Sequence, residues 1–227
     1  YENENINKRN FFIKKNGELG LTISTILCLL DAYKNNLKNI IIFEDDILIH
    51  KNFEDEMFKL KDIIIEKDYV YLGASQHSWH KLKITSNKKY YEYNKSNPST
   101  GTFAIFLNKK MIEIALKEYL KMIYIVDNLN ILIQEKLKII TLFPNLAISD
   151  VSESDIREKR NFESHLDRFK WDISLYDYLV EECDYNFKFN KKKDVVNLNE
   201  ILDRLKINRS NKKYFVLFTL INYFLSK

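Results

Sequence analysis

The sequence predicts an α/β protein with a mostly parallel β-sheet sandwiched by helices, followed by a helical C-terminal extension. Two observations lead to this prediction. Short β-branched runs alternate with stretches of helical periodicity up to about residue 150, and the chain becomes rich in aromatic and charged residues after Arg157. We therefore expect a first domain over residues 1–160 and a helical extension over residues 161–227 that packs on it.

Hydrophobic spacing predicts the first helix. Ile23, Ile26 and Leu30 recur at three- and four-residue steps, which is typical of a helix with one apolar face. A turn over residues 17–20 comes before it, so Thr22 or Ser24 is expected to cap the helix.

A strand is predicted directly after this helix. The run 39–43 is continuous, apolar and β-branched, so we expect a central strand covered on both faces. The other predicted elements are helices over 53–66, 108–120, 127–136, 173–182 and 198–205, and strands over 69–72, 102–107 and 139–143.

Composition excludes several classes of protein. The 227 residues are 45% hydrophobic and 30% charged, with only 2 Pro and 4 Gly, which excludes a disordered or collagen-like chain. The net charge of +4 is spread along the chain without a basic face, so we expect no nucleic-acid partner. No run approaches the ~20 apolar residues of a membrane helix, and no signal peptide is visible.

Cysteine usage favours a reducing compartment. Cys28 and Cys183 match no disulfide framework or zinc motif, so we expect a cytoplasmic protein. The many Ile, Lys and Asn residues are typical of AT-rich genomes and suit the cytoplasm of a bacterium or of a virus-infected host cell. The segment from Tyr214 to Leu225 is apolar nearly all round. It is expected to pack against the first domain, with a peripheral membrane contact and a homodimer surface as the open alternatives.

Three carboxylates follow the predicted strand 39–43. Open α/β sheets bind ligands at the carboxyl ends of their strands, where Glu44, Asp45 and Asp46 are expected to lie. Adjacent carboxylates repel one another, and Mg²⁺ or Mn²⁺ would relieve that repulsion through the oxygen ligands that these ions prefer. The alternative is a solvated acidic turn.

Several short motifs occur in an order that resembles glycosyltransferase family 25, the lipopolysaccharide and collagen sugar transferases. The resemblance covers roughly residues 16–157, and all four glycines fall within its motifs. These motifs are Gly17-Glu18-Leu19-Gly20, Ile40-Ile41-Ile42-Phe43-Glu44-Asp45-Asp46, Tyr71-Leu72-Gly73, Gly101-Thr102-Phe103-Ala104, Ile125-Val126-Asp127, Pro144-Asn145-Leu146 and Ser154-Asp155-Ile156.

The resemblance implies a GT-A fold and transfer of a sugar from a nucleotide-sugar donor, in the first place a UDP-sugar, to a hydroxyl of a glycan, lipid or protein. It also implies Mn²⁺ (or Mg²⁺) and inversion at the sugar. Asp46 would be the direct metal ligand with Glu44 assisting, and Asp127 would be the general base on the acceptor hydroxyl. The donor would be bound by Glu44, Asp45, Gly17, Glu18, Gly73, Trp79, Gly101 and Thr102, and His77 or His80 could add a metal ligand.

Two segments depart from the family pattern. Nothing before Gly17 supplies the family's Arg-rich first strand, and Ser24-Thr25 stands where members often have Ser-His. An inactive GT-A-like binding module is therefore kept as the alternative. A different Mg²⁺-dependent enzyme on phosphates ranks lower, because Ile47-Leu48 does not fit a phosphatase nucleophile motif and no Gly-rich phosphate loop is present. A purely structural protein would bind no ligand in a metal-dependent way.

Overall fold

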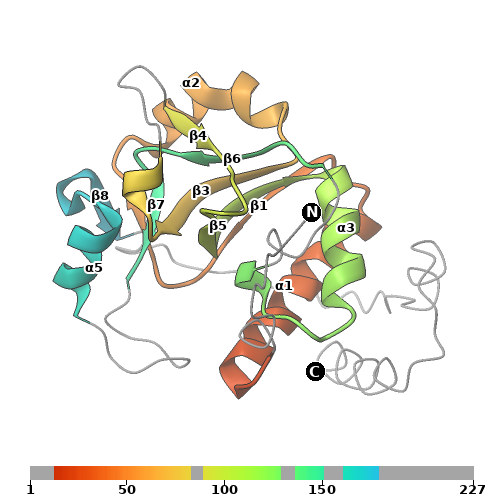
Figure 1. The fold of residues 1–227 in the computed structure, drawn as a ribbon. Coiled ribbons are helices and arrows are strands. Elements are labelled where there is room, and N and C mark those ends of the chain that lie inside the picture. Colours follow the sequence, from red (N-terminus) through yellow and green to blue (C-terminus); the bar gives the residue numbers. More distant parts are fainter. Residues whose placement is uncertain (1–12, 83–88, 129–135, 151–160, 179–227) are drawn as a thin grey trace.

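The computed structural model describes residues 13–82, 89–128, 136–150 and 161–178 (Figure 1). In these residues a five-stranded sheet has the strand order β1-β5-β3-β6-β4, and a three-stranded sheet has the order β7-β2-β8. The strands are β1 (Asn39–Phe43), β2 (Ile47–His50), β3 (Tyr69–Gln76), β4 (Tyr90–Glu92), β5 (Ser99–Asn108), β6 (Ile139–Leu142), β7 (Ala147–Ser149) and β8 (Tyr176–Tyr178).

Helices cover both faces of the larger sheet, which confirms the predicted α/β class (Figure 1). One core cluster joins the sheet to α1 and α3, and the other joins it to α2, α5 and the smaller sheet. Successive side chains of β3 point to opposite faces of the sheet, so this strand contributes to both clusters. Tyr69 and Tyr71 belong to the first cluster, and Val70 and Leu72 belong to the second. The described helices are α1 (Asn16–Lys34), α2 (Phe53–Ile65), α3 (Lys109–Tyr119) and α5 (Phe162–Phe169), with 3₁₀ turns η2 (Trp79–Lys81), η3 (Val126–Asn128) and η4 (Ile173–Leu175).

The described sheet is mixed, so the prediction of a mostly parallel sheet was wrong. Strands β1, β3 and β6 run in one direction, but β5 lies antiparallel between β1 and β3, and only β3 and β6 are parallel neighbours. A parallel neighbour requires a long crossover, usually a helix. The described part of the connection from β3 to β5 holds only η2 and β4, and β5 returns antiparallel.

Strand β1 is an edge strand among the described residues, and not the covered central strand that its apolar run predicts. Ile40 and Ile42 pack against the core beneath α1, whereas Ile41 and Phe43 are 40% and 37% exposed. A short apolar run indicates a strand but does not specify its position in the sheet.

Helix α1 begins at Asn16, before both residues predicted to cap it, Thr22 and Ser24. The Glu18 carboxylate accepts hydrogen bonds from the backbone N–H groups of Lys14 (2.8 Å) and Lys15 (3.1 Å). A carboxylate in the first turn that binds preceding N–H groups stabilises a helix N-terminus. The segment 17–20 therefore forms the first turn of the helix.

The described part of the C-terminal region differs from the predicted helix over 173–182. Ile173–Leu175 is a 3₁₀ turn, and the next three residues form β8, which pairs with β2. Helix α5 is not predicted from the sequence. Phe169 and Trp171 belong to the core cluster that contains β2, so this segment packs on the main sheet. The division of the chain at residue 160 stays a prediction.

Other predictions fall partly or wholly beyond the described residues. The stretch expected to be helical from Asp127 onward is seen only as η3, and the segments 198–205 and 214–225 lie outside the described parts. Among the helices that the structure describes, none has the length and apolar character to cross a membrane.

Asp68 joins the start of β3 to two other strands. Its carboxylate accepts hydrogen bonds from the backbone N–H of Lys138 (2.8 Å) and from Asn108 Nδ2 (3.0 Å), and Lys110 lies 3.6 Å away. Burial alone would raise the pKa of Asp68, but these hydrogen bonds and the charge of Lys110 outweigh it, so the pKa lies below its ordinary value.

We predict that Asp68→Asn lowers the free energy of unfolding by about 1–3 kcal/mol at pH 7, because the amide leaves one buried donor unmatched. The loss should shrink as the pH falls below 3.8, the ordinary pKa of an Asp carboxyl, toward the lowered native pKa of Asp68, because the wild-type carboxyl then becomes protonated as well. Urea unfolding at pH 7 and at pH 3 measures both values. Asp62→Asn, an exposed change on α2, is the control. An equal loss at both pH values would contradict the prediction.

Candidate functional site

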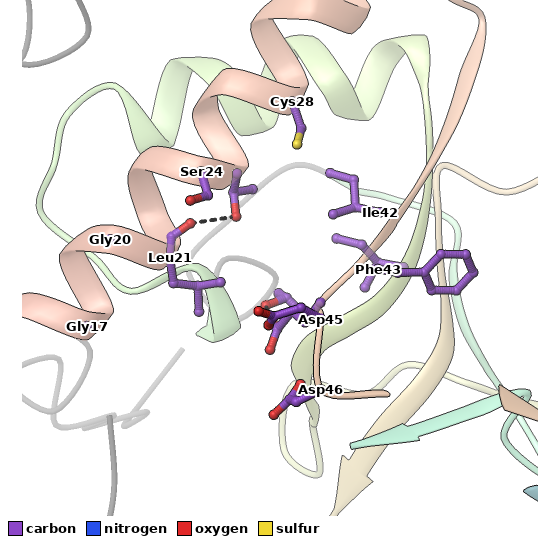
Figure 2. A pocket seen from close by; sticks show the side chains of 13 residues that line it. Gly17, Gly20, Leu21, Ser24, Cys28, Ile42, Phe43, Asp45 and Asp46 are labelled. Carbon is purple, nitrogen blue, oxygen red and sulfur yellow. Dashed lines mark hydrogen bonds between the residues drawn. The ribbon is translucent and has the colours of Figure 1, made fainter. Parts of the chain in front are cut away.

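A cavity of about 760 Å³ lies between α1 and the carboxyl end of β1 (Figure 2). One wall is a single face of α1, and the other comes from the end of β1, the turn after it and β5. The lining residues are Gly17, Gly20, Leu21, Ser24, Thr25, Cys28, Ile42, Phe43, Glu44, Asp45, Asp46, Thr102 and Ile105.

Small side chains keep the α1 wall open. A Cβ placed on Gly20 would meet no atom within 4 Å, so the helix surface there faces free space. The Thr25 hydroxyl donates to the carbonyl of Leu21 at 2.9 Å, shown as the dashed line in Figure 2, and Ser24 is exposed on the same wall. The wall thus offers Ser24 as a polar contact, while the Thr25 hydroxyl is used within the helix.

Thr102 brings two carboxyl groups together from distant parts of the chain. Its hydroxyl lies 2.9 Å from Glu44 Oε1, at the end of β1, and 3.0 Å from Asp127 Oδ1, in η3. Because a hydroxyl has one hydrogen, it donates to one carboxylate at a time. Both contacts are hydrogen bonds only when Glu44 or Asp127 carries a proton.

The surroundings of Glu44 favour its protonated form. Burial is the largest cause that raises the pKa of Glu44 to about 7, and the negative charge of Asp127 raises it further, while the hydrogen bond from Thr102 acts against them. Asp46 and Asp45 add smaller contributions in the upward direction. Near neutral pH, Glu44 therefore exchanges a proton readily in the metal-free protein.

Asp46 has one satisfied and one unsatisfied carboxylate oxygen. Its Oδ2 accepts a hydrogen bond from the Ser149 hydroxyl at 3.2 Å. Its Oδ1 is buried and has no hydrogen-bond partner among the described residues. Burial is the main cause that raises the pKa of Asp46. A buried carboxylate oxygen without a donor is unfavourable, and a bound cation would satisfy it.

This donor set fits a hard divalent cation. The described residues contain no group of three or more His, Cys, Asp or Glu side chains placed to hold a metal ion. Mg²⁺ and Mn²⁺ are commonly held by one or two carboxylates, with substrate phosphates and water completing the shell. Asp46, with Glu44 nearby on the same cavity wall, supplies such a partial set.

Five predicted site residues line the cavity: Gly17, Glu44, Asp45, Asp46 and Thr102. Asp127 contacts one of them, Thr102.

Gly73, Gly101, Glu18 and Trp79 are not among the lining residues. A Cβ on Gly73 would collide with the carbonyl oxygen of Ala147 and with the Phe103 ring, so this glycine permits close packing of β3 against β7. Gly101 has φ +88°, a backbone conformation that favours glycine. Glu18 binds the N-terminus of α1, as described above.

Trp79 packs against the rings of Phe143, with centroids 5.0 Å apart, and of Tyr91, at 6.1 Å. The ammonium of Lys170 lies 5.4 Å from the centroid of its ring. His77 contacts the Phe169 ring edge-on, and His80 is exposed. A donor contact for Trp79 and a metal contact for either histidine remain predictions.

Two residues of the site, Ser149 and Cys28, are not predicted from the sequence. Ser149 reaches Asp46 only because β7 pairs with β2, which aligns Ser149 with Ile47. Cys28 lies three helical turns after Gly17 on the α1 wall, so helical spacing from the Gly17 motif could have identified it.

We predict that the metal-free protein loses stability as the pH rises from about 4.5 to about 7. Glu44 keeps its proton in the folded state up to about pH 7, whereas the unfolded chain releases it near its usual pKa of 4.5. The folded state therefore binds more protons in this window, and the free energy of unfolding falls by roughly 3 kcal/mol in total across it. Glu44→Gln should remove this slope.

Urea unfolding between pH 4.5 and 8 in the presence of a chelator measures this slope. Glu54→Gln, an exposed change on α2, is the matched control and should keep it. A slope that survives in Glu44→Gln would show that another group causes it.

Comparison with known proteins identifies the family of this chain. The family model described as glycosyltransferase family 25 (LPS biosynthesis protein) matches residues 4–129, more than half of the chain. No curated protein matches the chain. The matched region contains α1, Thr102, Asp127 and the acidic cluster of Glu44, Asp45 and Asp46. The chain belongs to glycosyltransferase family 25 and is a glycosyltransferase.

Proposed function

We propose that this glycosyltransferase moves a sugar from a nucleotide-sugar donor, in the first place a UDP-sugar, to a hydroxyl of a glycan, lipid or protein. The reaction would depend on Mn²⁺ or Mg²⁺ and proceed with inversion. The observation that supports this most directly is the buried Oδ1 of Asp46 on the wall of the cavity, which has no hydrogen-bond partner in the part of the chain that the structure describes. The volume of about 760 Å³ is in the range of small-molecule sites.

Asp46 would hold the metal through Oδ1, and Glu44 would assist. When bound, such an ion supplies Lewis-acid stabilisation of the negative charge on the departing nucleoside diphosphate. The acidic cluster is unsuited to bind a diphosphate by itself, because carboxylates and phosphates repel each other. Donor binding at this wall is therefore expected to require the cation.

Asp127 would act as the general base. The acceptor oxygen forms a bond to the anomeric carbon, the bond from that carbon to the diphosphate oxygen breaks, and the acceptor proton passes to Asp127. A single displacement of this kind inverts the sugar. The contact between Thr102 Oγ1 and Asp127 Oδ1, at 3.0 Å, would orient this carboxylate for the role. The neighbouring Glu44, with its raised pKa, adds less negative charge beside this base when it is protonated.

We predict that a nucleotide-sugar raises the melting temperature only with Mn²⁺ or Mg²⁺, and that Asp46→Ala abolishes this shift. A ligand at 100 times its Kd stabilises by about 2.7 kcal/mol, or a few degrees for a chain of this size. A panel of nucleotide-sugars measured by thermal unfolding tests this, with Asp62→Ala as the control. A shift that persists in Asp46→Ala would contradict the metal site.

We predict that Asp127→Asn leaves donor affinity nearly unchanged and lowers kcat by about 10²–10⁴-fold, because the amide keeps the contact with Thr102 but accepts no proton. Donor binding by calorimetry and turnover on an acceptor panel separate the two effects. Full activity of Asp127→Asn would exclude it as the base. Metal-dependent donor binding without transfer by the wild type, on every acceptor tried, would favour the inactive binding module.

A further inference from the structure

Ser149 lies where it can orient the candidate metal ligand. It is buried in β7, and β7 pairs antiparallel with β2 so that Ser149 stands opposite Ile47, the residue after Asp46. The pairing continues one step further, since the backbone N–H of Asp150 donates to the carbonyl of Asp46 at 2.7 Å. The main chain of Asp46 is therefore held in place by a neighbouring strand.

The hydroxyl of Ser149 restricts the orientation of the Asp46 side chain, which the main-chain hydrogen bonds do not determine. Rotation about the side-chain bonds of Asp46 would otherwise exchange its two carboxylate oxygens. The hydrogen bond from Ser149 Oγ to Asp46 Oδ2, at 3.2 Å, holds Oδ2 against β7. Oδ1 is then left buried with no hydrogen-bond partner in the described parts of the chain.

We propose that Ser149 is a positioning residue that holds Asp46 with Oδ1 directed at the divalent cation. The inference rests on the metal site of the proposed function and adds a residue to it. Ser149 lies beyond residues 4–129, which the family model matches. Hydrogen bonds to a metal-binding carboxylate orient it, and their loss typically weakens metal binding 10- to 100-fold.

The test is the affinity for Mn²⁺ alone, measured on the full chain by calorimetry or by the electron paramagnetic resonance signal of free Mn²⁺. Ser149→Ala is expected to raise the Kd about 10-fold or more. Ser149→Cys fills the same space with a much weaker donor and should also weaken binding. Ser149→Thr keeps the hydroxyl and should bind nearly as wild type.

Asp62→Ala, an exposed change on α2 away from the cavity, is the control and should leave the Mn²⁺ affinity unchanged. Turnover gives a second measurement: activity that Ser149→Ala loses at low Mn²⁺ should return at high Mn²⁺, because the ligand itself is intact. Thermal unfolding of each variant identifies any that fails to fold, and Ser149→Cys then takes the place of Ser149→Ala.

The outcomes separate this inference from the proposed function. If Asp46→Ala abolishes Mn²⁺ binding while Ser149→Ala and Ser149→Cys bind as wild type, the role of Ser149 is refuted and the metal site stands. If Asp46→Ala binds Mn²⁺ as wild type, the metal site itself is refuted, and the role of Ser149 with it.

Discussion

Repulsion between carboxylates is the constraint on which the cavity wall depends. Glu44 is partly buried near Asp127 and Asp46, whose negative charges raise its pKa, and the charges of Asp45 and Asp150 act in the same direction on Asp46. Two hydroxyl donors lower the energy of these carboxylates, Thr102 between Glu44 and Asp127 and Ser149 on Asp46. The remainder must be offset by the two apolar cores elsewhere in the fold. The carboxylates of the site therefore keep an unfavourable repulsion, which binding of a cation or of a proton lowers. Both a cation and a proton take part in the proposed chemistry.

The antiparallel insertion of β5 gives this arrangement its geometry. Strand β5 pairs with β1 on one side and with β3 on the other, so Thr102 lies beside the end of β1. The ladder extends to the first acidic residue, since the N–H of Glu44 donates to the carbonyl of Phe103 at 2.9 Å. A parallel strand in this place would enter the sheet from the opposite end. The departure from a parallel sheet is thus what places the bridging hydroxyl between two carboxyl groups.

Local sequence patterns predicted most helices and strands and the acidic residues 44–46. They did not predict features that depend on pairing between distant segments of the chain. Periodicity predicted α2 and α3, and the apolar runs predicted β1 and β6 close to their observed bounds. They also predicted β3 and β5, but β3 continues to Gln76 and β5 begins at Ser99, beyond the predicted ranges 69–72 and 102–107. The same patterns carry no information on strand direction or edge position, which depend on connections and partners. Glu44, Asp46 and Thr102 could be named from motifs, but Ser149 could not, since its contact with Asp46 spans 103 positions of sequence. Gly73 was interpreted as a ligand contact, and only the packed structure shows that β7 excludes a side chain there.

The thiol on the cavity wall gives this protein a natural reporter position. Cys28 is exposed on α1, on the same face as Gly17 and Ser24, so a fluorophore or spin label attached to it would lie within the cavity. Partial burial of the sulfur and the negative charge of Asp31 raise the pKa of Cys28. Alkylation, which requires the thiolate, would therefore proceed slowly at neutral pH and faster in alkaline buffer. With Cys183 replaced by serine, the rate of alkylation would follow occupancy of the cavity without any knowledge of the acceptor.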